Sequence, residues 1–525
     1  MDCNINFYQC YQYSCWTLNR TTKFSSERDH CVTNVIAVIA NGFVSQTIPC
    51  WSCPPPVMNW DSIPFLSVAE LTAQLSTQPE IRQFLAQYHS DPLDRSVTVQ
   101  EWYKFAKSQP QRVRLVEADI PSGILPDRVQ GDLRDFKVSG PRKGRVPDDA
   151  MYNRHEDLRE KVARGNTVMY WHDHQQSTVT YDCLIFALRK FTGGMGDEDE
   201  NQPDDQKTWL KYFLRPVEQT ARIVCTEKAN GEAAHFSARF IKDRFIVAAG
   251  SKNVHLVCRT YADIAKYSDS RYMVAKTVAE STLDLIRSLS PEHASILLSF
   301  MHHTQVTGVF EVLQPHYQHV VDLSHLKSSQ MNFICFTLPY GIESKKNQES
   351  LCALSPDKSL DFARSLGMIT IDYETIDADQ GETRMDLVRQ GYGREGEVFY
   401  YVDAKGHVIG LLKKKTAWYI LCRAIREKAS HAVLDYIKGR GANFDESDRI
   451  KKLKSRIQQI QTWLGFDDEY RGIWQELGSQ FITWLLARAA KNEVQPDKVR
   501  GFFPGLWNRF LLETNNSDRV EWRAV

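Results

Sequence analysis

The sequence has 525 residues, enough for two to four domains, and 42% of them are hydrophobic and 25% charged. Lys and Arg together number 65, as do Asp and Glu, so net charge indicates no nucleic-acid or membrane partner. No apolar run approaches the roughly 18 to 20 residues that span a bilayer, and the first residues do not resemble a signal peptide. We therefore expect an intracellular protein, cytoplasmic or nuclear, with no membrane contact.

Residues 1–56 are interpreted as a cysteine-rich extension. Half of the 12 cysteines lie there, at Cys3, Cys10, Cys15, Cys31, Cys50 and Cys53. The last two have the spacing of a zinc-ligand pair, and His30 is a further potential ligand. Because only one such pair is present and the other spacings are irregular, we favour incidental thiols over a structural zinc site.

A small helical region is expected over 57–120, since Ser67 with Glu70 and Thr98 with Glu101 both have capping-box spacing. Residues 121–160 are rich in Pro, Gly and charge, and are interpreted as a linker. From 161 to 420, short alternating runs broken by Gly, Asn and Asp predict β-strands.

Helices are expected to fill residues 421–525. Ile450, Leu453, Ile457 and Ile460 recur at helical spacing before a terminating Gly465. Further apolar residues continue this pattern in a second helix, namely Ile473, Trp474, Leu477, Phe481, Trp484 and Leu485. These stripes indicate a domain core. Lys451, Lys452, Lys454 and Arg456 among them fit either a solvated helix face or a phosphate-binding face.

Lys228, in the stretch CTEKANGEAA, follows a predicted strand and precedes a glycine. A free lysine is almost wholly protonated at pH 7, so a nucleophilic lysine needs nearby cations, a metal ion or burial. Lys413 and Lys415 are two apart on a predicted strand and therefore point to the same face, where an anion such as phosphate would relieve their repulsion. GEVFYY and VIGLLKKK are expected to pair as a hairpin beside Glu395.

Five short motifs occur in one order: Lys228-Ala-Asn-Gly231, Ser251-Lys252, Phe310-Glu311-Val-Leu-Gln-Pro315, Glu395-Gly-Glu-Val398 and Lys413-Lys-Lys415-Thr416-Ala-Trp-Tyr419. This series resembles the covalent nucleotidyltransferases, and among them the ATP-dependent RNA ligases of the T4 RNA ligase 1 type. The resemblance covers about 165–420. It departs from the family at Asn230, where Asp is more frequent, and at Arg189-Lys190-Phe191-Thr192, which only partly matches the family's phosphate-contacting element.

The resemblance implies an α+β fold: an antiparallel-sheet nucleotidyltransferase domain, ATP-grasp-like, flanked by helical N- and C-terminal regions. It implies that Lys228 becomes adenylylated by ATP, with Lys413 and Lys415 on the α-phosphate, and that Glu395 and Glu311 hold Mg²⁺ or Mn²⁺. The nucleotide-binding residues implied are Thr226, Glu227, Gly231, Lys252, Glu311, Phe336, Arg189 and Lys190, with Phe333 as another candidate for adenine stacking. The expected partner is RNA with 5′-phosphate and 3′-hydroxyl ends, bound partly by the C-terminal domain, and the expected state is a monomer.

Two alternatives remain. One is a DNA ligase or capping-type nucleotidyltransferase, although those families usually continue into a β-rich domain where helices are expected here. The other is an inactive RNA-binding protein on a ligase fold. His172 with His174, and His302 with His303, resemble metal-ligand pairs, but such pairs are more often ordinary surface or core histidines.

Overall fold

A computed structural model describes residues 32–39, 42–49, 62–140, 146, 148–192, 208–339, 349–439 and 444–520. The chain divides into two compact units, Met1–Ser62 and Ile63–Val525. In the first, β1 (Val32–Ile39) and β2 (Gly42–Pro49) pair antiparallel. The six N-terminal cysteines and His30 lie outside the described residues, so the zinc hypothesis stays untested. Among the described residues, no helix is long and apolar enough to cross a bilayer.

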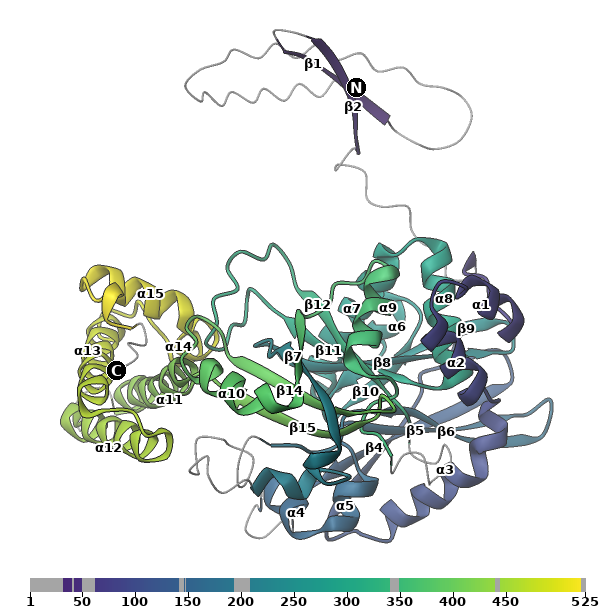
Figure 1. Ribbon diagram of the computed structural model, residues 1–525, viewed down its shortest axis with the longest axis horizontal. Helices are drawn as coiled ribbons and strands as arrows, with labels where there is room; N and C mark the ends of the chain where they lie inside the picture. The colour runs from purple at the N-terminus through teal and green to yellow at the C-terminus, as the bar shows by residue number, and fades with distance from the viewer. Residues whose placement is uncertain are drawn as a thin grey trace. The chain divides into compact units, whose positions relative to one another are not determined.

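Three antiparallel sheets form the β part of the second unit (Figure 1). The first has the order β3 (Val113–Asp119), β4 (Val129–Val138), β5 (Asn166–Asp173) and β6 (Thr178–Phe186). The second has the order β10 (His255–Cys258), β9 (Arg244–Ser251), β8 (Glu232–Ile241), β11 (Thr307–Leu313) and β12 (Gln330–Thr337). The third has the order β13 (Tyr373–Asp377), β7 (Thr220–Glu227), β14 (Gly396–Asp403) and β15 (Val408–Lys415).

The third sheet is covered on both faces, which explains the almost continuous apolar run in β14. Val398, Tyr400 and Val402 pack into one hydrophobic cluster, whereas Phe399 and Tyr401 pack into another on the opposite face. The hairpin predicted from GEVFYY and VIGLLKKK is confirmed, because β14 pairs antiparallel with β15.

The interpretation of 121–160 as a linker is wrong. This segment contains β4 in the middle of the first sheet, followed by α4 (Asp148–Arg154) and α5 (Glu156–Lys161). Leu133, Phe136 and Val138 are buried, but Leu133 lies on the opposite face of β4 from Phe136 and Val138, so the strand shows no simple alternation in the sequence.

Three helices precede the first sheet: α1 (Val68–Gln74), α2 (Pro79–Tyr88) and α3 (Pro92–Lys107). The capping box of Ser67 and Glu70 is confirmed at α1. The one predicted at Thr98 is wrong, because α3 already begins at Pro92, where the Asp91 side chain accepts a hydrogen bond from the first turn. Thr98 therefore lies inside the helix.

Five helices occur between the strands that follow. They are α6 (Tyr261–Ala265), α7 (Met273–Ser288), α8 (Pro291–Thr304), α9 (Pro356–Ser365) and α10 (Gly381–Arg389). Helices α7 and α8 pack on β9 and β8 of the five-stranded sheet, and α9 packs on β12. Since antiparallel strands leave one face to be covered, these helices complete the core on that side.

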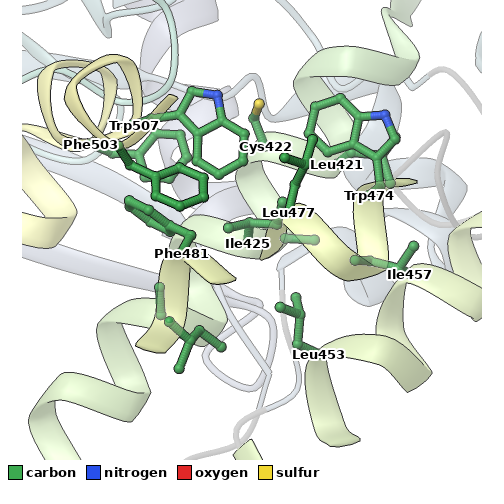
Figure 2. Packing of buried hydrophobic residues seen from close by; sticks show 14 of the residues in the cluster. Leu421, Cys422, Ile425, Leu453, Ile457, Trp474, Leu477, Phe481, Phe503 and Trp507 are labelled. Carbon is green, nitrogen blue, oxygen red and sulfur yellow. The ribbon is translucent and has the colours of Figure 1, made fainter. Parts of the chain in front are cut away.

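After β15 the described chain is helical, as predicted. The helices are α11 (Ala417–Lys438), α12 (Glu446–Leu464), α13 (Asp468–Ala489), α14 (Pro496–Gly501) and α15 (Phe503–Glu513). Helices α11, α12 and α13 pack together as a bundle (Figure 1). Figure 2 shows its core, in which Trp474 and Trp507 stack and Phe481 meets Trp507 edge-on. Helix α12 ends at Gly465 with φ +73°, so the predicted stop is confirmed.

Candidate active site

Lys228 lies at the end of β7, where its backbone is tied to the neighbouring strand. Its N–H donates to the carbonyl oxygen of Gly396 on β14 at 2.9 Å. Its Nζ lies 2.7 Å from Glu395 Oε1, with 23% of the lysine side chain exposed and 6% of the glutamate's. The motif lysine and the motif carboxylate, 167 residues apart, therefore form a largely buried ion pair.

Glu311, on β11 of the five-stranded sheet, faces the same amine. Its Oε1 accepts a hydrogen bond of 3.0 Å from the Gly231 N–H, and burial raises the pKa of Glu311 to about 7. Burial opposes the charge of Lys228, but the carboxylates of Glu395 and Glu311 outweigh it and raise the pKa of Lys228 above its ordinary value. The lysine is thus held as an ammonium ion between two sheets.

Gly231 must be a glycine for the turn after Lys228 to reach β11. A Cβ atom at this position would lie 2.2 Å from the carbonyl oxygen of Val312. Any side chain would therefore push the turn away from the strand and break the hydrogen bond to Glu311.

Lys413 and Lys415 are buried on β15, opposite Val398 and Gly396 of β14. The charge of Lys415 acts on Lys228, where it opposes protonation, and the charge of Lys413 acts on Lys190. The two lysines predicted to share one face thus reach two parts of one site: the nucleophile and the phosphate-contacting element.

A cavity of about 240 Å³ opens beside Lys228, between the β7–β14 side of one sheet and the β8, β11 and β12 strands of the other. Its walls include the predicted residues Thr226, Glu227, Lys228, Lys252, Glu311 and Arg189. Phe336 is not brought to this cavity. It is fully buried against Phe300 and Phe362, as Phe333 is against Phe310.

Other cavity-lining residues were not singled out from the sequence. The aromatic ones are Phe191, Phe310 and Tyr400, and the basic or polar ones are Arg164 and His235. Phe191 adjoins the predicted Arg189 and Lys190, so its place in that element was a signal for an aromatic wall. Arg164 and His235 carry no local pattern that would have marked them.

Asn230 joins four parts of the site. Its Nδ2 donates to Glu395 Oε2 at 2.7 Å and to the Tyr419 hydroxyl at 3.1 Å. Its Oδ1 accepts hydrogen bonds from the N–H groups of Val320 and Val321 at 3.0 and 3.1 Å. This bond explains why Asn stands where the family more often has Asp, because an ionised Asp could not donate a hydrogen bond to Glu395. Through Tyr419 the same residue holds the first turn of α11.

Three cations meet two carboxylates at the cavity. Arg164 lies 3.1 Å from Asp148 and 3.3 Å from Asp149. Lys252 lies 2.5 Å from Asp148, and Lys190 lies 3.1 Å from Asp149. Burial, together with the charges of Lys413 and Arg164, lowers the pKa of Lys190 to about 6.

Glu395 and Glu311 fit a hard divalent cation. Two buried carboxyl groups flank the Lys228 amine and offer oxygen atoms to a cation. Mg²⁺ or Mn²⁺ prefers oxygen ligands and is commonly held by one or two carboxylates together with water and substrate phosphates. No group of three or more His, Cys, Asp or Glu side chains suited to a metal ion occurs within the described ranges.

The histidine pairs have local partners instead. His302 Nδ1 accepts a hydrogen bond from the Phe240 N–H at 2.9 Å, and His303 Nε2 contacts the Leu66 carbonyl at 2.8 Å. The rings of His172 and His174 meet edge to face, with centroids 4.1 Å apart.

Comparisons with known proteins add three findings. A model of the family described as "Domain of unknown function (DUF7920)" matches residues 141–426. No curated protein matches the chain. Weak structural similarity links it to an archaeal ATP-dependent RNA ligase, with TM-score 0.36, 12% identity, and 79% of this chain and 82% of that one covered. A Naegleria gruberi RNA ligase solved with PPi has a TM-score of 0.25 and 11% identity, with 59% of this chain and 97% of that one covered.

Proposed function

The chain belongs to the family matched over residues 141–426, whose description names no activity, and we propose an activity from the geometry of the site. The proposed activity is that of an ATP-dependent RNA ligase, which joins an RNA 5′-phosphate to a 3′-hydroxyl through a covalent lysyl-AMP intermediate. The observation that carries this proposal is the convergence around the Lys228 amine of Glu395, Glu311 and Lys415, so that four separate sequence motifs meet at one lysine.

In the first step, the Lys228 amine attacks the α-phosphorus of ATP, forming a phosphorus–nitrogen bond and expelling pyrophosphate. An oxygen of an RNA 5′-phosphate next attacks that phosphorus, releasing the lysine and giving an RNA capped by AMP. Finally, an RNA 3′-hydroxyl attacks the 5′-phosphorus, forming the phosphodiester and releasing AMP. Each step depends on positioning and on countering negative charge at phosphorus.

Lys228 can attack only as the neutral amine. Lys415 opposes its protonation, whereas Glu395 and Glu311 favour it, so neutralisation of these two carboxylates is the condition for attack. A divalent cation held by Glu395 and Glu311 would supply that positive charge and polarise the phosphate oxygens. In this proposal Lys413 and Lys415 bind the α-phosphate, and Lys190 binds the departing pyrophosphate.

The helices after β15 favour an RNA ligase over the two related enzymes. DNA ligases and capping enzymes usually continue into a β-rich domain, whereas α11 to α15 form a helical domain here. Tyr419 in α11 is hydrogen-bonded to Asn230, so this domain adjoins the nucleophile. We assign to it the binding of the RNA strand.

The test is self-adenylylation with α-labelled ATP and Mg²⁺ or Mn²⁺. We expect a covalent AMP adduct on the wild-type protein and none on Lys228→Ala. Lys358→Ala is the matched control, because Lys358 also pairs with a glutamate, Glu80 at 3.0 Å, and lies outside the cavity lining. An adduct that survives Lys228→Ala, or none on the wild type, would overturn the proposal. Sealing of single-stranded RNA, nicked duplex and DNA ends then identifies the substrate.

A further inference from the structure

The two carboxylates at the start of α4 form a second feature of the site. Asp148 bridges Arg164 and Lys252, and Asp149 bridges Arg164 and Lys190. Arg164 is therefore shared by two neighbouring anionic groups, each of which also contacts its own lysine. Two phosphates joined in a chain present the same pattern of adjacent negative groups to a set of cations.

The three cations come from separate places in the fold. Arg164 precedes β5, Lys190 follows β6, and Lys252 follows β9 of a different sheet. Arg164 and Lys252 line the cavity that contains Lys228, and the Lys190 side chain is fully buried next to Lys413. Like charges gathered in this way repel one another, so they need an anion. The ligand-free chain supplies that anion from α4.

The carboxylates are bound as strongly charged groups. Burial opposes the ionisation of Asp148, but Arg164 and Lys252 lower the pKa of Asp148 to about 2. Three basic side chains face two carboxylates, and the pKa of one of them, Lys190, is lowered to about 6, so Arg164 and Lys252 carry the positive charge of the cluster at pH 7. Asp148 and Asp149 remain about a quarter exposed, and α4 itself is anchored further along by buried Met151 and Tyr152. The first turn can therefore give way while the helix stays attached.

We propose that Asp148 and Asp149, in the ligand-free protein, take the places of two phosphate groups on Arg164, Lys190 and Lys252. The inference rests on the proposed function for the identity of the ligand, which is the β,γ-phosphate end of a nucleoside triphosphate or free pyrophosphate. Binding then exchanges carboxylates for phosphates on the same cations. Asp148 and Asp149 thereby weaken the affinity for nucleotide and help to displace pyrophosphate after Lys228 has reacted.

Inorganic tripolyphosphate tests this without any reaction. We expect calorimetry on the full chain to give a Kd about threefold to tenfold lower for Asp148→Asn/Asp149→Asn than for the wild type, since the variant removes the carboxylates that compete with phosphate for the same basic groups. Asp157→Asn, which removes a carboxylate paired with Arg112 at 3.3 Å, should leave the Kd unchanged. An unchanged or higher Kd in the double variant would overturn the proposal, because the acid pair would then only hold the cations in place.

Two further measurements test the same proposal independently of the double variant. If the double variant does not fold, Asp148→Asn alone retains the partner of Lys190 and should still bind tripolyphosphate more tightly. On the wild type, tripolyphosphate should speed hydrogen exchange of the amides at the start of α4, and slower exchange there would contradict displacement. Self-adenylylation is scored separately: absence of an AMP adduct refutes the ligase, whereas the tripolyphosphate result alone decides the subsite.

Discussion

Replacing Asn230 by Asp tests whether the amide is required where the family more often has a carboxylate. The change keeps the shape of the side chain and its acceptor for the Val320 and Val321 N–H groups. It replaces the donor to Glu395 Oε2, at 2.7 Å, by a second carboxylate oxygen. Asn230 is 6% exposed and Glu395 5% exposed, so water would not screen the two charges effectively.

The expected cost follows from two limits. Two like charges that relax to about 4 Å repel by about 4 kcal/mol at an effective dielectric constant of about 20. Protonating an Asp with an unfolded pKa of about 3.9 costs about 4 kcal/mol at pH 7 but only about 1.5 kcal/mol at pH 5. The new carboxyl has a raised pKa in the folded state, so it destabilises increasingly as pH rises from about 4 towards that pKa. We expect Asn230→Asp to lose about 2 to 4 kcal/mol at pH 7 and about half of that at pH 5.

Urea unfolding at pH 5, 6 and 7, followed by tryptophan fluorescence, measures this loss. Asn230→Ala is the control, since it removes the same hydrogen bonds without adding a charge, and its loss of stability should not change over this pH range. A loss for Asn230→Asp that is equal at pH 5 and pH 7, or no loss at all, would refute the reasoning.

Three other predictions concern the rest of the chain. Burial raises the pKa of Glu311 to about 7, so the ligand-free wild type should lose stability relative to Glu311→Gln as pH rises from about 5 to 8. Melting temperatures of both proteins at these two pH values measure the difference. Gly396→Ala would place a Cβ 2.0 Å from a carbonyl oxygen of β15, so it should abolish self-adenylylation, whereas Gly472→Ala in α13, where a Cβ would meet no atom within 4 Å, should retain it. Trp474→Ala should cost about 3 to 5 kcal/mol in urea unfolding and Leu512→Ala, 70% exposed, less than about 0.5 kcal/mol.

Local patterns predicted the elements whose residues interact with near neighbours. The β14–β15 hairpin and the termination of α12 at Gly465 follow from strand alternation and from glycine's freedom at φ +73°. The same patterns failed at β4, because its buried residues lie on both faces of the strand and do not alternate with exposed ones. Burial also decided which aromatic rings reach the cavity: Phe336 carries a plausible motif position but packs in the core.

The contacts that complete the site join distant segments, so no local pattern announces them. Asp149 in α4 meets Lys190 after β6, and Asn230 after β7 meets Glu395 before β14, because the fold brings together segments that are far apart in the sequence. The ordered motif series pointed to Lys228 and Glu395 without their geometry. It could not indicate that the pKa of Lys228 is raised in the ligand-free chain, since that depends on how close Glu311 and Glu395 lie.

The hydrogen bond between Asn230 and Tyr419 sets an order of events during synthesis, because the two residues are 189 positions apart. At about 5 to 20 residues per second, a ribosome needs about 10 to 40 s to travel between them. During that time Lys228 and Asn230 have been synthesised, but α11, whose Tyr419 accepts a hydrogen bond from Asn230, has not. A nascent chain that ends before α11 therefore has the nucleophile but lacks one of the groups that hold its surroundings, and the finished site forms only once the helical domain has begun to fold.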